Sequence, residues 1–264
     1  FGDWFCVFVL DLGVFGAGLA TATGAVISLA VMCSHFFSRK CTLHLVPVQK
    51  LFKKLGEIAV TGFSSFFVDV AMGILTVLFN RQIMKYLDSD ALAVYATVIN
   101  ISTFVQCCAY SVGQAAQPIL STNYGANNAA RIRQALHLAL GTSMVFAAFW
   151  TGLSELFPQL YIHIFMRPSA EILSIAPAII RRYSVSFVLL PVNIFSTYYF
   201  QSILRPKDSF IVSIARGLLV SGLLIFALPA HFAPEAIWWA MPLTELVTSV
   251  YAAYAMRKSL TGLC

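Results

Sequence analysis

Asp69 is the side chain with the clearest potential for chemistry, because it lies inside a long apolar segment, Val60–Phe79. Inserting a carboxylate near the middle of a membrane helix costs about 2.5–3.5 kcal/mol on insertion scales. A carboxylate is therefore expected there only if it has a function or a specific partner. A buried carboxylate can take up and release a proton or bind a cation. Asp69 is therefore a candidate coupling site, and the alternative is a packing role in a polar contact between helices.

Polar side chains follow stripes on three of the apolar segments. At about 100° per residue, the amides and hydroxyls of each segment fall on one side of a helix. Convergence of the three stripes would build a polar cavity within an apolar bundle. The same groups also join helices through hydrogen bonds, each worth roughly 0.6 kcal/mol, so both interpretations stay open. The candidate cavity-lining residues are Asn80, Gln106, Tyr110, Gln114 and Asn193.

Two further charges lie within apolar segments, Arg216 in Ser209–Leu228 and Glu245 in Ala236–Met256. Arg216 is close enough to the segment end for its guanidinium to reach the membrane surface. Glu245 follows Pro242, so it either satisfies backbone groups freed by a kink or pairs with Arg216. We expect a structural role for both side chains.

Motifs for covalent or metal chemistry are absent from the sequence. It contains no HExxH, GxSxG or phosphate-binding loop, and its five His lie singly. The six Cys show neither zinc-site spacing nor a disulfide framework. We expect neither catalytic residues nor a resident metal or cofactor, although a membrane-embedded enzyme is weighed below.

The elements that must position these residues are membrane helices. Hydrophobic residues make up 59% of the 264 residues and charged residues only 11%, and the mean hydropathy is +0.81. These values lie outside the range of soluble domains, so lipid bilayer surrounds the chain. The net charge of +6 is spread along short loops without a basic face, so no nucleic-acid partner is expected.

Seven spans are predicted, and the charges between them indicate their orientation. Eleven Lys and Arg fall on one side and five on the other, which places the C-terminus in the cytoplasm. The expected location of the chain is the inner (plasma) membrane. The predicted spans are Gly13–Ser34, Val60–Asn80, Leu92–Leu120, Leu136–Leu156, Tyr183–Leu204, Ser209–Leu228 and Ile237–Met256.

Two shorter segments are predicted to lie at the membrane surface. In Leu45–Leu55, apolar residues recur at helical spacing among three Lys, which is typical of an amphipathic helix on the inner leaflet. Ser169–Arg182 is predicted to be a short outer helix, with Ser169 as its N-cap and Glu171 in its first turn.

Several stretches, in order, resemble the MATE multidrug and toxin extrusion transporters. GVFGAGLAT at residues 13–21 is similar to the sixth helix of that family. GQAAQP at 113–118 and NYGANN at 123–128 resemble the end of its eighth helix and the loop that follows. ARG at 215–217 and WAMPLTE at 239–245 are similar to helices eleven and twelve. The sequence is most similar to the DinF/MepA-like branch.

The resemblance implies an all-α membrane fold of twelve helices in two six-helix lobes, of which this chain is an N-terminally truncated fragment. Residues 1–34 would be the end of helix five and helix six of the N-terminal lobe, 35–59 a cytoplasmic inter-lobe loop, 60–258 the C-terminal lobe, and 259–264 a cytoplasmic tail. Another branch of the family carries a glutamate on helix seven and an aspartate on helix ten. Here Asp69 lies about one turn before that glutamate position, and Tyr183–Leu204 has no carboxylate.

The activity that the resemblance implies is proton- or sodium-coupled antiport. The exported substrates would be amphipathic organic cations or drugs, and the rest of the N-terminal lobe would be the partner. One alternative is a lipid-linked oligosaccharide flippase of the same superfamily, whose cavity should be strongly cationic. A structural membrane subunit would explain the polar contacts but not the motifs. A membrane-embedded enzyme is a further alternative, but this sequence contains no pair of residues with catalytic spacing.

Overall fold

The computed structural model describes residues 2–37 and 50–261 of the chain. Residues 1, 38–49 and 262–264 lie outside this description, as do the side chains of Asp3, Thr61, Ser64, Ser65, Val68 and Asp69. All regular secondary structure in the described ranges is helical. The chain divides into two compact units, Phe1–Phe52 and Lys53–Cys264, and each is described by itself.

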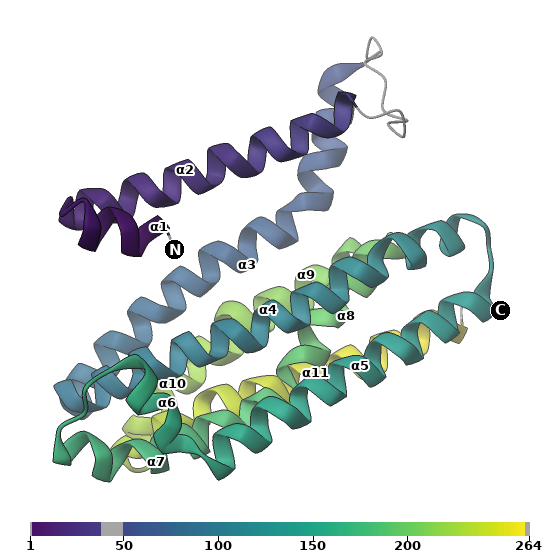
Figure 1. Ribbon diagram of the computed structural model, residues 1–264. Helices are drawn as coiled ribbons and strands as arrows, with labels where there is room; N and C mark the ends of the chain where they lie inside the picture. Colours follow the sequence, from purple (N-terminus) through teal and green to yellow (C-terminus); the bar gives the residue numbers. More distant parts are fainter. Residues whose placement is uncertain (1, 38–49, 262–264) are drawn as a thin grey trace. The chain divides into compact units, whose positions relative to one another are not determined.

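The first unit is built around the long helix α2 (Gly13–Ser34; Figure 1). Its sequence places apolar side chains on all sides of the helix. It is preceded by α1 (Gly2–Trp4) and η1 (Phe5–Val9) and followed by η2 (His35–Phe37). A Cβ atom at Gly16 would lie 2.7 Å from the carbonyl oxygen of Cys6, so glycine permits the close approach of η1 to α2. An all-round apolar surface is typical of a helix that lipid or other helices surround.

The second unit is a bundle of long helices. Its first three helices are α3 (Leu51–Tyr86), which begins just before the unit boundary, α4 (Ser89–Gly125) and α5 (Ala129–Leu156). The remaining elements are α6 (Pro158–Phe165), α7 (Ala170–Ser184), η3 (Val185–Val188), α8 (Leu190–Ser202), α9 (Pro206–Ile214), η4 (Ala215–Leu219), α10 (Val220–His231), η5 (Pro234–Trp239) and α11 (Ala240–Thr261).

The core of the second unit forms around α4, which packs against both α5 and α8. The α4 residues that face inward recur at helical spacing, among them Val94, Val98, Ile101 and Val105. Tyr95 of α4 stacks on Phe79 of α3 with ring centroids 4.9 Å apart. These contacts fix α3 and α4 against each other at the centre of the unit.

Short polar side chains determine where three helices begin. Asp88 accepts a hydrogen bond from the backbone N–H of Ala91 at 2.8 Å, and Asn128 accepts one from Arg131 N–H at 3.1 Å. Ser169 accepts one from Ile172 N–H at 3.2 Å, which confirms its predicted role as an N-cap. Because of the first two caps, α4 and α5 begin earlier than the predicted spans Leu92–Leu120 and Leu136–Leu156.

Two predicted spans are interrupted helices in the structure. In place of a helix over Tyr183–Leu204, α7 passes into the 3₁₀ turn η3 and then into α8, with Pro191 near its start. In place of a helix over Ser209–Leu228, α9 and α10 are joined by η4, a π-helical turn. The predicted helix Ser169–Arg182 is confirmed by α7, which spans Ala170–Ser184 and is followed by η3 and α8.

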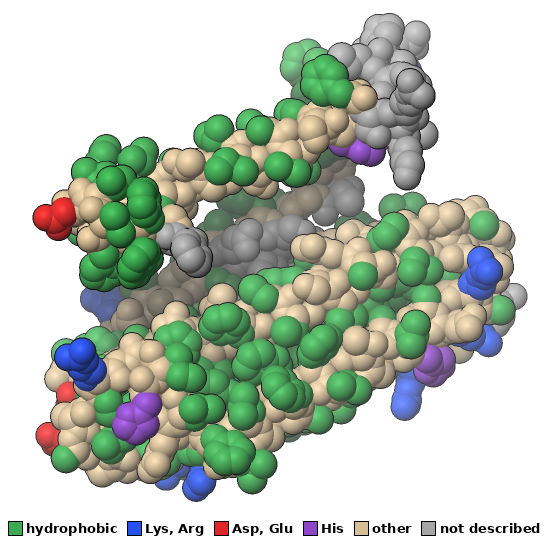
Figure 2. Space-filling view, viewed as in Figure 1, with side chains coloured by type: hydrophobic (Ala, Val, Ile, Leu, Met, Phe, Trp, Pro, Cys, Tyr) green, Lys and Arg blue, Asp and Glu red, His purple; other side chains and the backbone are tan. Residues whose placement is uncertain are grey.

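The surface of the second unit is that of a membrane protein. Figure 2 shows hydrophobic side chains over its visible face, with Lys and Arg towards its ends. Five described stretches are long and apolar enough to span a bilayer, namely Gly13–Phe37, Ser89–Gly125, Ala129–Leu156, Ala170–Ser202 and Pro206–His231. With 36 and 22 residues, α3 and α11 cover the other two predicted spans and have the length for a crossing.

The predicted amphipathic helix Leu45–Leu55 is only partly described. Residues 45–49 lie outside the described ranges, and Leu51–Leu55 already belongs to α3. The helix is continuous through Val60, where we placed the start of the second lobe, and the unit boundary falls at residues 52 and 53. The surface segment and the first span of the second unit therefore share one helix over the described residues.

Candidate functional site

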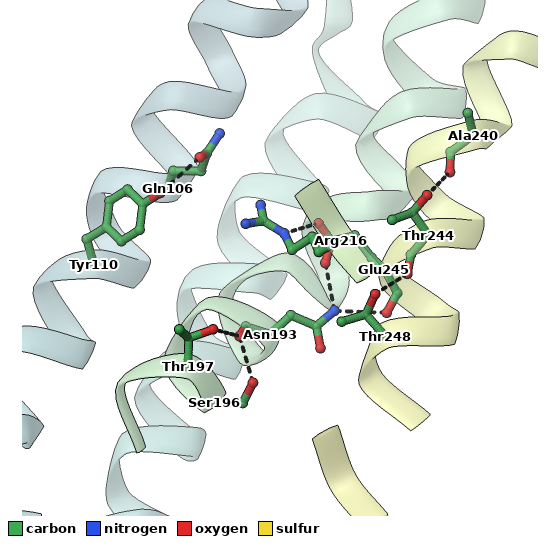
Figure 3. A network of polar contacts seen from close by, with 10 residues as sticks. All are labelled: Gln106, Tyr110, Asn193, Ser196, Thr197, Arg216, Ala240, Thr244, Glu245 and Thr248. Carbon is green, nitrogen blue, oxygen red and sulfur yellow. Dashed lines mark hydrogen bonds and ion pairs between the residues drawn. The ribbon is translucent and has the colours of Figure 1, made fainter. Parts of the chain in front are cut away.

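A polar network lies at the centre of the second unit, and its middle residue is Glu245 (Figure 3). The Glu245 side chain has no exposed surface, and the Arg216 residue is 8% exposed. Arg216 Nε donates to Glu245 Oε1 at 2.6 Å, and Asn193 Nδ2 donates to Glu245 Oε2 at 2.6 Å. The same Asn193 nitrogen lies 2.9 Å from the backbone oxygen of Glu245. The carboxylate is thus held by one cation and one amide.

Three elements bring these side chains together, and one of them is not an α-helix. Arg216 lies in the π-helical turn η4, a kind of turn that often occurs at functional sites. Asn193 lies in α8, three residues after Leu190, where the helix resumes beyond η3. Glu245 lies in the second turn of α11. Pro242 occupies the first turn of that helix, where its missing N–H leaves no intrahelical hydrogen bond unmade.

The network is charge-balanced but sensitive to the loss of either partner. Desolvation of two charges offsets much of their attraction, so a buried ion pair adds little net stability. Removal of one partner leaves an uncompensated buried charge and typically costs about 3–5 kcal/mol. The sequence left two alternatives for Arg216, to extend to the membrane surface or to pair with Glu245. In the structure Arg216 is buried against Glu245. Pairing with Glu245 is the alternative that the structure contains.

A small cavity of about 40 Å³ lies beside Arg216. This volume exceeds the roughly 15 Å³ that one water molecule needs. Ser102 Oγ on its wall is buried, and Tyr183 lines the same cavity. The other polar lining residues are Thr76, Tyr95, Thr103, Gln106, Tyr183 and Arg216. The cavity therefore offers hydroxyl, amide and guanidinium groups to a small polar guest.

The structure separates the predicted cavity-lining residues. Gln106 lines the cavity, and the Tyr110 hydroxyl lies 3.4 Å from Gln106 Oε1. Asn193 is fully buried and is bound to Glu245 instead of lining the cavity. Asn80 is half-buried, Gln114 is exposed, and neither lines this cavity. Thr76 of α3 and Gln106 of α4 line this cavity together, so two of the three polar stripes meet here, and a transport-cavity role for the five predicted residues stays a prediction.

Close packing of α4 and α8 holds Tyr110 in place. A Cβ atom at Gly113 would lie 2.4 Å from Cδ2 of Tyr198, so only glycine fits there without movement of that ring. The rings of Tyr110 and Tyr198 meet edge to face with centroids 6.3 Å apart. Gly113 thus allows α8 to come near enough for Tyr198 to pack on Tyr110.

The Asp69 side chain lies outside the described residues, although its backbone is part of α3. Met72 and Thr76 follow it by three and seven residues, and both line the cavity beside Arg216. Residues at these spacings share one face of a helix. By spacing alone Asp69 belongs to the same stripe of the sequence as Thr76, and its role as a coupling carboxylate stays a prediction.

Sequence reasoning did not include Ser102 and Tyr183 among the lining residues. Ser102 lies four residues before Gln106, so helical spacing alone was a signal for it. Tyr183 was assigned to the end of a span because the 3₁₀ turn that follows it was not predicted. In the structure its ring packs edge to face on Phe187, beside the cavity.

Comparison with known families gives one match, to the MatE family over residues 64–225. The chain is also 23% identical over 264 residues to the multidrug export protein MepA of Staphylococcus saprophyticus, covering 98% of this chain and 58% of that protein. The chain thus spans somewhat more than half the length of that curated relative.

Solved transporter structures share the fold. A multidrug resistance MATE family transporter of the MOP superfamily, in an outward-facing conformation, matches with a TM-score of 0.88 at 20% identity. The match covers 99% of this chain and 59% of that one. A MOP superfamily transporter from Pyrococcus furiosus, described as having a binding pocket of reverse polarity, matches with a TM-score of 0.88 at 18% identity. That match covers 99% of this chain and 60% of that one.

Proposed function

Because the chain belongs to the MatE family, whose members are transporters and not enzymes, we propose that it forms part of a secondary transporter that exports amphipathic, often cationic organic compounds. An inward flow of protons or sodium ions would drive the export as antiport. The observation that carries this proposal is the polar network and cavity of Arg216, Gln106 and Glu245 inside an otherwise apolar bundle. In membrane proteins such groups mark substrate and ion pathways.

Transport by alternating access needs two bodies that move against each other around a central site. The second unit would supply one wall of that site, with Gln106 and Tyr110 nearest to it. The chain covers 58% of the MepA relative, and we propose that the partner is an N-terminal lobe of the same protein. We place the protein in the plasma membrane with its C-terminus in the cytoplasm, from the distribution of Lys and Arg.

Asp69 is the carboxylate that we propose for coupling. Glu245 already has two partners, Arg216 and Asn193, so a proton or sodium ion would have to displace an existing contact. Asp69 is at a span position where burial is costly, and its helix face contains Thr76 of the cavity wall. A carboxylate in such a place can change its protonation state with small changes in its surroundings.

Drug export is favoured over lipid-linked oligosaccharide transport by the charge at the cavity. A site for pyrophosphate needs several unpaired cations. Among the described residues, Arg216 is the cationic side chain on the cavity wall, and Glu245 already pairs with it. The wall of this unit near Arg216 is therefore close to neutral and does not offer the unpaired cations that a pyrophosphate group needs.

The test is dye accumulation in cells that express the gene product containing this chain. We expect lower ethidium accumulation than in control cells, and we expect the difference to disappear when proton and sodium gradients are both collapsed. Collapsing each gradient alone identifies the coupling ion. Export that persists without either gradient and follows the ATP level would contradict the antiport proposal.

A further inference from the structure

A groove with a volume of about 550 Å³ lies between α4 and α5, away from the network around Glu245. These two helices run antiparallel and side by side, joined by the short connection after Gly125 (Figure 1). The groove walls are mainly apolar and include Val112, Ile119 and Leu138. The transport proposal makes no use of this groove.

The polarity of the groove changes along its length. At the end near the α4–α5 connection it is lined by Arg131, Gln134 and Asn123, whose side-chain nitrogen donates to Ile119 O of its own helix at 2.8 Å. At the far end it is lined by Ser111 and Thr142. Both of these hydroxyls donate to carbonyl groups of their own helices, at 2.8 and 2.9 Å, so they offer little polarity to a ligand. One end of the groove is therefore polar and basic, and the rest is apolar.

Arg131 supplies a positive charge at the polar end. Its side chain is exposed, and the structure gives its guanidinium no ion pair with any described acidic residue. Arg131 is also the third residue of α5, whose first N–H groups have no intrahelical acceptors. The helix dipole there has the same sign as the guanidinium, and both attract an anion.

The length of the groove matches one leaflet of a bilayer. Ser111 and Asn123 are twelve residues apart on α4, which corresponds to about 18 Å at 1.5 Å per residue. Half of a hydrocarbon core is about 15 Å thick. A lipid tail in the groove would thus reach from the bilayer centre to the level of Arg131.

We propose that this groove binds an anionic phospholipid, with one acyl chain along the apolar walls and the phosphate at Arg131. Charge complementarity at one end and apolar walls of leaflet length together fit that single occupant. The proposal depends on the position of the chain in a membrane and not on transport activity, so the two can fail separately.

The experiment measures lipid binding to the purified gene product by native mass spectrometry. Phosphatidylglycerol and phosphatidylcholine with the same acyl chains are titrated against the protein. One cation near a membrane surface is worth about 1 kcal/mol, so we expect about fivefold tighter binding of phosphatidylglycerol. Arg131→Gln should abolish this preference. Arg133→Gln, on the same helix but outside the groove lining, should keep it.

A second variant tests the apolar part of the groove. Ala115 is an exposed lining residue, and Ala115→Phe should fill the groove and weaken binding of both lipids. Equal binding of the two lipids, an unchanged preference in Arg131→Gln, or unchanged binding in Ala115→Phe would each overturn the proposal. Displacement of phosphatidylglycerol by glycerol phosphate alone at similar concentration would also overturn it, because the site would then hold a free phosphate and not a lipid.

Discussion

At the residue scale, the charges inside the second unit occur in two settings. Arg216 and Glu245 neutralise each other, and Asn193 satisfies the remaining carboxylate oxygen. Asp69 lies on a different helix, and we propose that it changes its ligand during transport. The same bundle thus contains one ion pair that holds helices together and one carboxylate that is a candidate for exchange with protons or cations.

Removing one member of the buried pair should destabilise the protein more than removing both. We expect Arg216→Met alone and Glu245→Met alone each to lower the free energy of unfolding by about 3–5 kcal/mol, because each leaves a buried charge without its partner. The double variant should regain most of that loss. Thermal denaturation of the purified protein in detergent measures all three.

The control for these single and double variants is an ion pair at the protein surface. Arg182 and Glu235 are paired at the surface, and Glu235 is 61% exposed. Glu235→Gln should change stability by less than about 1 kcal/mol. A double variant of Arg216 and Glu245 as unstable as the single ones would show that specific hydrogen bonds, and not charge balance, hold the network together.

Asp69→Asn keeps the shape of the side chain and removes its charge. We expect the variant to reach the membrane at a normal level but to lose much of its export, or to shift the pH dependence of export, because proton or cation exchange needs the carboxylate. Dye efflux at several external pH values measures both effects.

Glu171→Gln is the matched control, since Glu171 is an exposed carboxylate in the first turn of α7. It should leave efflux unchanged at every pH. Normal expression of Asp69→Asn with unaltered efflux across the pH range would assign Asp69 to helix packing alone.

At the element scale, the contact between α4 and α8 depends on the absence of a side chain at Gly113. A Cβ atom there would lie 2.4 Å from the Tyr198 ring, which also packs on Tyr110. We expect Gly113→Ala to destabilise the protein by about 1–3 kcal/mol through overpacking and to weaken binding of a transported dye. Thermal denaturation and dye-binding titration measure these effects.

Gly141 of α5 provides the comparison, because a Cβ atom there would meet nothing within 4 Å. Gly141→Ala should change stability by no more than about 1 kcal/mol and leave dye binding unaltered. If Gly113→Ala behaves in the same way, α4 and α8 tolerate a wider separation than their packing indicates.

Hydrophobicity predicted the helices of this chain but not their ends and interruptions. A membrane span is recognised from the hydrophobicity of about twenty residues taken together, so the spans could be predicted from the sequence. The early starts of α4 and α5 depend on single hydrogen bonds to Asp88 and Asn128. The turns η3 and η4 depend on packing between helices, which residue types alone do not specify.

The site was predictable to a similar degree. The rarity of charges in apolar segments pointed to Arg216 and Glu245, and their pairing was one of two alternatives. Helical spacing pointed to Gln106 and Tyr110, which lie together. Spacing describes one helix at a time, so it could not show that Asn193 faces Glu245 and not the cavity. Such a contact depends on the rotation of α8 relative to α11.

At the scale of the whole molecule, the chain has one large helical unit and a smaller one built around α2. We expect the 264 residues alone to insert into the membrane but not to export dye, because alternating access needs a second lobe. Membrane fractionation and ethidium efflux in cells measure the two properties. Export by these residues alone would contradict the two-lobe requirement, and native mass spectrometry would then show whether a second copy replaces the other lobe.

The π-helical turn η4 contains one residue more than a regular helix would need for the same turn. It therefore resembles an insertion that the helix has absorbed without a loop. Deleting Leu219 should therefore restore an unbroken α-helix from Pro206 to His231, and its two halves should keep nearly the same rotation relative to each other. Side chains beyond the turn, such as Ile225, would then keep their orientation in the bundle, and the helix would only become shorter by one residue. Chains of this family that lack the extra residue should have a regular helix here, which makes the length of this helix a marker for the π-helical turn in sequences without a structure.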